Sequence, residues 1–202
     1  EPKTVQQESA TLHSYKVDVC ESDQVKTVFA QVAKDFGRPI DCVVANAGIN
    51  VPPGPVAQFD VETFKKIVNV NLQGAFHVLT EAAKNIADHG TIIGLTTSMV
   101  RIGIPGGGPY TATKAAVESL LRSMSKELSP RGIRVNGVAP GPVDTDLFHS
   151  GKTEEIKARS AALSPFNRIG RPDEIAEVIA FLASDKASWI HGQIIQPNGG
   201  MI

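Results

Sequence analysis

The sequence of 202 residues is poor in cysteine and contains no long apolar stretch. Its two cysteines, Cys20 and Cys42, are too few and too far apart for a disulfide framework or a cysteine metal site, so we interpret them as free thiols in a reducing compartment. No apolar run approaches the ~18 residues that a membrane span needs. Residues 1–7 are polar throughout, unlike a signal peptide. These absences predict a cytoplasmic protein without a membrane span or a bound metal.

An excess of charge of one sign is also lacking. Lys and Arg number 20 against 21 Asp and Glu, the formal net charge is −1, and no five like charges follow one another. A nucleic-acid surface would need clustered basic residues, and an acidic tail would show as a run of charge. The expected partners are therefore a small-molecule substrate and copies of the same chain, rather than nucleic acid or a membrane.

Short apolar runs alternate with longer amphipathic segments, which is typical of βαβ units and a parallel sheet. Ser22 or Asp23 is expected to cap the first helix and Asp60 the second. We interpret residues 1–202 as one α/β domain with a doubly wound parallel sheet. The predicted strands are 12–19, 40–45, 91–95, 133–138 and 192–196, the predicted helices are 22–36, 61–87, 110–128 and 172–183, and 145–164 is irregular with some helical potential.

A dinucleotide-binding fold normally opens with a strand, a glycine-rich turn and a helix. No glycine-rich turn precedes the strand predicted at 12–19. We therefore expect the first β-α-β portion of such a fold to be absent from this sequence, either through truncation or because the protein has more residues at its amino end. Loss of the helix N-terminus that binds a pyrophosphate would remove its strongest anion-binding element.

The sharpest chemical signal is Tyr110-Thr-Ala-Thr-Lys114 at the start of a predicted helix. Residues four apart share a helix face, so the phenol and the ammonium can point into one site. A free tyrosine has a pKa of about 10, and a nearby positive charge would lower that pKa toward neutral pH. The same spacing also occurs on ordinary helix surfaces, so the pair is not decisive by itself.

Polar residues upstream of this pair have two readings each. Thr97 and Ser98 follow the strand predicted at 91–95, where a hydroxyl can donate to a substrate carbonyl or simply satisfy the local backbone. Asn71 lies between apolar residues of a predicted helix, which favours an amide aimed at a specific partner. An exposed or locally bonded amide is the equal alternative for Asn71.

Two loop motifs complete the pattern. Asn46-Ala47-Gly48 follows one predicted strand and Pro140-Gly141-Pro142-Val143-Asp144-Thr145 another. Small residues there let a ligand approach the backbone, although turn formation alone explains either motif. In their order and spacing, these motifs, together with Asn198-Gly199-Gly200, resemble the short-chain dehydrogenase/reductase family, in its 3-oxoacyl-carrier-protein reductase-like and aldehyde reductase-like branch.

The resemblance implies a Rossmann-like oxidoreductase that interconverts a carbonyl compound and its alcohol by hydride transfer, with NADP(H) favoured over NAD(H). Tyr110 would be the general acid or base, Lys114 would lower the phenol's pKa and bind the nicotinamide ribose, and Asn71 would hold a proton-relay water. The family usually has a serine thirteen residues before the tyrosine, where this chain has Thr97; Ser98 is adjacent, and the choice stays open. The implied cofactor-binding residues are Asp18, Val19, Asn46, Ala47, Gly48, Tyr110, Lys114, Pro140, Gly141, Val143 and Thr145.

Residues 146–168 correspond to the family's variable substrate lid, whose apolar residues favour an apolar carbonyl compound or acyl chain. The resemblance also implies a homo-tetramer through two long helices, with contacts from Ala75, Val78, Leu79, Ala115, Ala116, Ser119 and Leu120. Two alternatives remain. One is a truncated, non-catalytic relative that acts as a binding or regulatory partner. The other is a dedicated 3-oxoacyl-carrier-protein reductase, whose Arg101, Arg168 and Arg171 would meet an acidic carrier protein.

Overall fold

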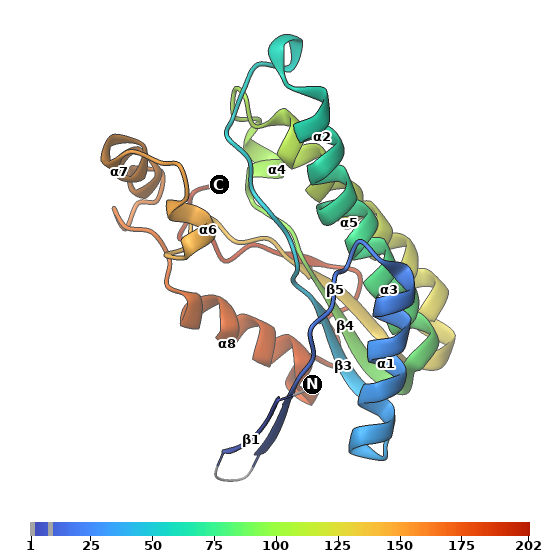
Figure 1. The fold of residues 1–202 in the computed structure, drawn as a ribbon. Coiled ribbons are helices and arrows are strands. Elements are labelled where there is room, and N and C mark those ends of the chain that lie inside the picture. The colour runs from blue at the N-terminus through green and yellow to red at the C-terminus, as the bar shows by residue number, and fades with distance from the viewer. Residues whose placement is uncertain (1–2, 8–9) are drawn as a thin grey trace.

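The computed structural model describes residues 3–7 and 10–202. A parallel sheet of four strands, in the order β3-β4-β5-β6, carries helices on both faces (Figure 1). Helices α1, α3 and α5 cover one face and α8 the other, which confirms the predicted α/β class. The strands are β3 Ile40–Ala45, β4 Ile86–Leu95, β5 Arg134–Val138 and β6 Ile194–Ile195, and the helices are α1 Ser22–Phe36, α3 Ala75–Asn85, α5 Gly108–Leu128 and α8 Pro172–Ala183.

The central strands are rich in apolar residues because both faces of the sheet are covered by helices. Ile92 packs into the core cluster with α1, α3 and α5, whereas its neighbour Ile93 packs with α8. Adjacent residues of a strand point to opposite faces of the sheet, so the continuous run predicted as a strand at 91–95 fills two separate cores. Both isoleucines are fully buried.

The strand predicted at 12–19 is wrong in its partner and its length. Strand β2, Ala10–Ser14, pairs antiparallel with β1, Lys3–Gln7, and neither belongs to the parallel sheet. Residues 15–18 are irregular. Within the described residues β3 forms one edge of the sheet, so the backbone of 10–14 finds its hydrogen bonds in a local hairpin instead.

The long helix predicted at 61–87 is one helical path with an irregular centre. It runs as α2, Val61–Ile67, then as a π-helical segment, Val68–Gly74, and then as α3. Strand β4 starts directly after α3 and is longer than the predicted 91–95. π-Helical turns inside α-helices are frequent at functional sites, and this one contains Asn71.

The predicted helix caps are half right. Asp60 caps α2 by accepting a hydrogen bond of 2.7 Å from the Thr63 backbone N–H. Neither Ser22 nor Asp23 caps α1, because the helix already begins at Ser22 and its N-cap is Glu21, whose side chain makes no capping bond. Asp23 lies in the first turn, where its charge suits the helix dipole.

Short helices connect the main elements at both ends of the sheet (Figure 1). Two of them, α6 and α7, form within the segment predicted as irregular, on the same side of the sheet as α8. No described helix is long and apolar enough to cross a membrane. These elements are η1 Val56–Gln58, α4 Met99–Ile102, η3 Ser129–Arg131, α6 Asp146–His149, α7 Glu154–Ala162 and η4 Asp185–Ala187.

Candidate active site

The predicted motifs meet at one edge of the sheet because the four strands are parallel and their carboxyl ends share that edge. Residues 46–48 follow β3, 96–98 follow β4, 139–141 follow β5, and 196–198 follow β6. The backbone ladder continues beyond the strands, since the Ser98 N–H donates to the Pro140 carbonyl at 2.9 Å and the Gly141 N–H to that of Pro197 at 3.2 Å. Loops that lie about 150 residues apart in the sequence, such as 46–48 and 196–198, are thereby brought to the same edge of the sheet.

Asn71 is fully buried in the π-helical segment and clamps the loop that follows β3. Its Oδ1 accepts from the Ile49 N–H at 2.8 Å, and its Nδ2 donates to the Ile49 carbonyl at 2.9 Å. The amide therefore has the specific partner that its sequence context suggested, and the exposed alternative is wrong. Ile49 itself was missed, because a backbone partner leaves no mark in the sequence.

Lys114 and Asn71 converge on Gly48. Lys114 is 5% exposed, and its Nζ donates to the Leu95 carbonyl at 3.0 Å. A Cβ added to Gly48 would lie 3.2 Å from that Nζ and 3.4 Å from Asn71 Oδ1. Three motifs from distant parts of the chain therefore touch at one point. Burial lowers the pKa of Lys114 to about 8, because desolvation disfavours the ammonium.

Tyr110 lies in the first turn of α5, four residues before Lys114. Burial raises its pKa to about 12, which is opposite to the lowering expected from Lys114. The reason is desolvation of the phenolate, while the neighbouring ammonium is bonded to the Leu95 carbonyl. With this pKa the phenol keeps its proton at neutral pH.

The two adjacent hydroxyls have different surroundings. Ser98 is fully buried, donates to the Ala139 carbonyl at 2.6 Å and accepts from Asn198 Nδ2 at 3.2 Å. Thr97 Oγ1 accepts from the Met99 N–H at 3.3 Å and donates to no acceptor among the described residues. The Ser98 hydroxyl proton is thus used in a hydrogen bond between two loops, whereas the Thr97 hydroxyl proton is available for donation to a ligand.

The loop after β5 leads into residues 146–168. A Cβ at Gly141 would lie 3.0 Å from Asn198 Cα, so only glycine fits comfortably there. Val143 forms an isolated β-bridge with Gly170, which joins the chain on either side of residues 146–168. Thr145 caps α6 by accepting from the Phe148 N–H at 3.2 Å.

Asp18 and Val19 are held against the helical layer. The Val19 carbonyl lies 2.9 Å from His77 Nδ1, and a Cβ at Gly74 would lie only 2.7 Å from Val19 Cγ2. The exposed Asp18 carboxylate accepts from the Cys20 N–H at 2.9 Å. This pair therefore packs at the end of the π-helical segment that carries Asn71.

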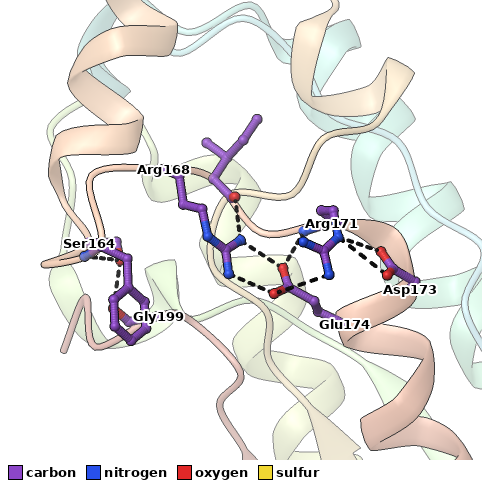
Figure 2. A network of polar contacts seen from close by, with 8 residues as sticks. Ser164, Arg168, Arg171, Asp173, Glu174 and Gly199 are labelled. Atoms are coloured by element: carbon purple, nitrogen blue, oxygen red, sulfur yellow. Dashed lines mark hydrogen bonds and ion pairs between the residues drawn. The ribbon is translucent and has the colours of Figure 1, made fainter.

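The arginines considered for a carrier protein are bonded within the chain. Arg168 makes two hydrogen bonds to Glu174, of 2.8 and 2.6 Å, and Arg171 contacts Asp173 (Figure 2). The Arg168 guanidinium and the Arg171 backbone N–H lower the pKa of Glu174 to about 2. Arg101 bonds to Glu118 at 2.9 Å. The three cations are therefore largely neutralised, which weakens their interpretation as a docking surface.

Glu118 was missed by sequence reasoning, although it is 1% exposed. Its signal was available: Lys114, Val117, Glu118 and Leu121 follow the i, i+3, i+4, i+7 spacing of a buried helix face. A carboxylate in such a stripe must have partners.

Among the described residues no group of three His, Cys, Asp or Glu side chains could hold a metal ion.

Known proteins resemble this chain in sequence and fold. Residues 2–202 match the family model described as Enoyl-(Acyl carrier protein) reductase. The chain is 42% identical to the NADPH-dependent aldehyde reductase-like protein, chloroplastic, of Arabidopsis thaliana, over 93% of this chain and 70% of that one. It is 38% identical to the 3-oxoacyl-[acyl-carrier-protein] reductase of Thermotoga maritima, over 93% and 76%. A short-chain dehydrogenase/reductase structure from Brucella melitensis superposes with a TM-score of 0.86 at 33% identity, over 94% and 76%. The chain belongs to the short-chain dehydrogenase/reductase family of oxidoreductases.

Proposed function

We propose that this protein reduces an apolar aldehyde or ketone to its alcohol with NADPH. The observation that carries the proposal is the meeting of Lys114 and Asn71 at Gly48, on the strand edge where α5 also presents Tyr110. The name of the Arabidopsis relative, an NADPH-dependent aldehyde reductase-like protein, supports both the substrate class and the dinucleotide.

In this proposal Tyr110 donates its phenolic proton to the carbonyl oxygen, and the Thr97 hydroxyl donates a hydrogen bond to the same oxygen as negative charge develops on it. A nicotinamide cofactor, when bound, supplies the hydride. Asn71 holds the loop after β3 in place and supports a proton-relay water.

The residues present fit the nicotinamide and ribose portions of such a cofactor, whereas the glycine-rich turn that binds the pyrophosphate is not in this sequence. The buried Lys114 ammonium has three N–H groups and gives one to the Leu95 carbonyl, which leaves donors for ribose hydroxyls. The other residues that would hold the cofactor are Asp18, Val19, Asn46, Ala47, Gly48, Pro140, Gly141, Val143 and Thr145.

The proposal is tested by following dinucleotide oxidation at 340 nm, an ordinary wavelength for NAD(P)H, with ketones, aldehydes and 3-oxoacyl thioesters. We expect NADPH oxidation with apolar aldehydes or ketones. Binding of a dinucleotide without turnover of any substrate would favour the non-catalytic alternative. Turnover restricted to a thioester on an acyl carrier protein would favour the carrier-protein reductase, the activity in the name of the Thermotoga maritima relative.

The two hydroxyls should separate in mutagenesis. Thr97→Val keeps the side-chain shape but removes the donor, so we expect kcat to fall at least ~10-fold, given that one oxyanion donor is commonly worth ~100-fold or more. Ser98→Ala leaves the Ala139 carbonyl without its donor and should cost about 1–3 kcal/mol of unfolding free energy. Steady-state kinetics and urea unfolding measure the two effects. The reverse pattern would assign the role to Ser98.

We further propose that the chain forms a homo-tetramer through a groove between the π-helical segment, α3 and α5. Phe76, 52% exposed, lies in this groove, whereas Leu79 is buried in the monomer core and Ala75 and Val78 pack against that core. Leu79 is therefore not available for the predicted contact, whereas Ala75 and Val78 are only partly buried. The groove is lined by Leu72, Gln73, Phe76, Ala116, Ser119 and Leu120.

Phe76→Glu should break this assembly, because it places a charge at the centre of an apolar contact. We expect light scattering coupled to size exclusion to show a smaller species. Phe36→Glu, at a phenylalanine that is 41% exposed on α1, is the matched control and should keep the wild-type mass. A monomeric wild type, or equal masses for all three proteins, would contradict the proposed groove.

We propose a cytoplasmic location. Cys20 and Cys42 are both free thiols in the structure, as expected in a reducing compartment. Burial raises the pKa of Cys42, which keeps that thiol protonated and unreactive.

A further inference from the structure

We propose that Glu118 and Arg101 form a positioning unit that sets the Thr97 hydroxyl relative to Tyr110 and Lys114. The inference rests on the proposed function, which it deepens by naming residues outside the catalytic group. Glu118 and Arg101 act through the backbone that carries Thr97, and neither needs to touch the substrate.

One carboxylate joins three elements. Glu118, on α5, accepts from Arg101 of α4 at 2.9 Å and from Arg122 of α5 at 2.9 Å, in both cases through Oε2. Its Oε1 accepts from Thr96 Oγ1, at the end of β4, at 3.3 Å. The carboxylate itself is almost wholly buried, whereas the two arginine side chains are 35% and 50% exposed.

These contacts bracket Thr97. Thr96 precedes it directly, and Arg101 follows four residues later on the short helix α4. Both bond to the same carboxylate, so the segment that carries Thr97 is fastened at each end to α5. Lys114 lies one turn before Glu118 on that helix, and Tyr110 one turn earlier again. The Thr97 hydroxyl and the Tyr110 phenol are thus both positioned relative to the same helix, α5.

The backbone hydrogen bonds around Thr97 do not connect its segment to α5, so side chains must make that connection. The Thr96 and Ser98 N–H groups donate to the Val138 and Pro140 carbonyls, which fixes the segment to β5 rather than to α5. Beyond Ser98, the backbone bonds of α4 are to its own preceding residues, Thr97, Ser98 and Met99. Among the described residues, the Arg101–Glu118 pair is therefore the polar connection from α4 to the helix that carries Tyr110.

A buried carboxylate is a poor way to gain stability. Burying the charge carries a desolvation penalty, and an apolar side chain of similar volume often does as well or better. Val117 and Leu121, its neighbours on the same buried face, show that apolar side chains pack well there. The polar residue at 118 supplies what an apolar one cannot, which is a directional link between α4, β4 and α5.

Arg101→Ala and Arg122→Ala make a matched pair for the test. Each removes one guanidinium from the same oxygen of Glu118, but only Arg101 links α4 to α5, because Arg122 lies on α5 itself. We expect Arg101→Ala to lower kcat about 10-fold with KM for the dinucleotide within about 2-fold, since small misplacements of a catalytic group can cost ~100-fold. Arg122→Ala should keep kcat within about 2-fold. Arg101→Lys, which can still reach the carboxylate, should recover part of the loss.

Hydrogen exchange gives a readout that does not depend on turnover. We expect the amides of 99–103 to exchange faster in Arg101→Ala than in the wild type, and at the wild-type rate in Arg122→Ala. Equal kcat losses in the two alanine variants, or unchanged kcat and exchange in Arg101→Ala, would overturn the positioning role. If the wild type reduces no carbonyl compound, the proposed function fails by itself, and the exchange comparison still decides whether the link exists.

Discussion

Tyr110→Phe is expected to lower carbonyl reduction at least ~100-fold while leaving dinucleotide affinity nearly unchanged. The substitution removes only the phenolic oxygen, so the helix and the half-buried ring are kept. Because burial raises the pKa of Tyr110 to about 12, the wild-type phenol is protonated at neutral pH. Phenylalanine cannot supply that proton, and water would have to replace it.

The chain offers a matched control, since it contains just one other tyrosine, Tyr15. Its hydroxyl donates to Asp35 Oδ2 at 2.5 Å, on the first helix rather than at the strand edge. Tyr15→Phe should therefore turn over at the wild-type rate. Turnover at pH 7 and NADPH fluorescence on binding measure the two quantities. Near-normal turnover of Tyr110→Phe would reject the phenol as the acid and the proposed mechanism with it.

The sequence predicts those parts of the fold that local pattern determines. Helix α1 has the predicted bounds because its apolar residues repeat at helical spacing and Gly37 ends it at φ 62°. Strand β3 likewise has its predicted bounds. The strand predicted at 12–19 fails because an extended segment does not reveal its partner. Strand pairing depends on residues far away in the chain, and here the partner is β1 rather than β3.

The position of the loops around the candidate site is predictable from the sequence, but the electrostatics of their side chains is not. Parallel strands bring their ends together whatever their side chains, so the loops at 46–48 and 96–98 could be placed correctly from order alone. The pKa of Tyr110 could not, because its direction depends on how much water the folded chain removes from the phenol. The choice between Thr97 and Ser98 depends on which hydroxyl the Ala139 carbonyl takes, a contact across 41 residues.

Lys114→Met should change both catalysis and the pH dependence of stability. The ammonium is proposed to bind the nicotinamide ribose, so its loss should weaken dinucleotide binding and lower turnover together. Methionine keeps most of the side-chain volume, which limits the cavity left behind. The Leu95 carbonyl loses its donor in the variant, a cost that does not depend on pH.

The stability effect has a definite sign. Folding lowers the pKa of Lys114 from 10.5 to about 8, so between these values the unfolded chain binds more protons than the folded one. Wild-type stability should therefore gain from Lys114 as pH rises from 8 toward 10.5, by roughly 3 kcal/mol at about 1.4 kcal/mol per unit of pKa. The burial that raises the pKa of Tyr110 acts in the opposite sense above pH 10, so the clearest window is pH 8 to 10.

Urea unfolding at fixed pH values across this window measures how the free energy of unfolding changes with pH. The test compares this slope between the wild type and the variants. Lys114→Met should lack the rise that the wild type shows. Lys126→Met, at an exposed lysine of the same helix, should keep it. A wild type and Lys114→Met with parallel profiles from pH 8 to 10 would mean that the ammonium is not desolvated by folding. The buried lysine beside Gly48, on which the proposed cofactor contact depends, would then be misplaced.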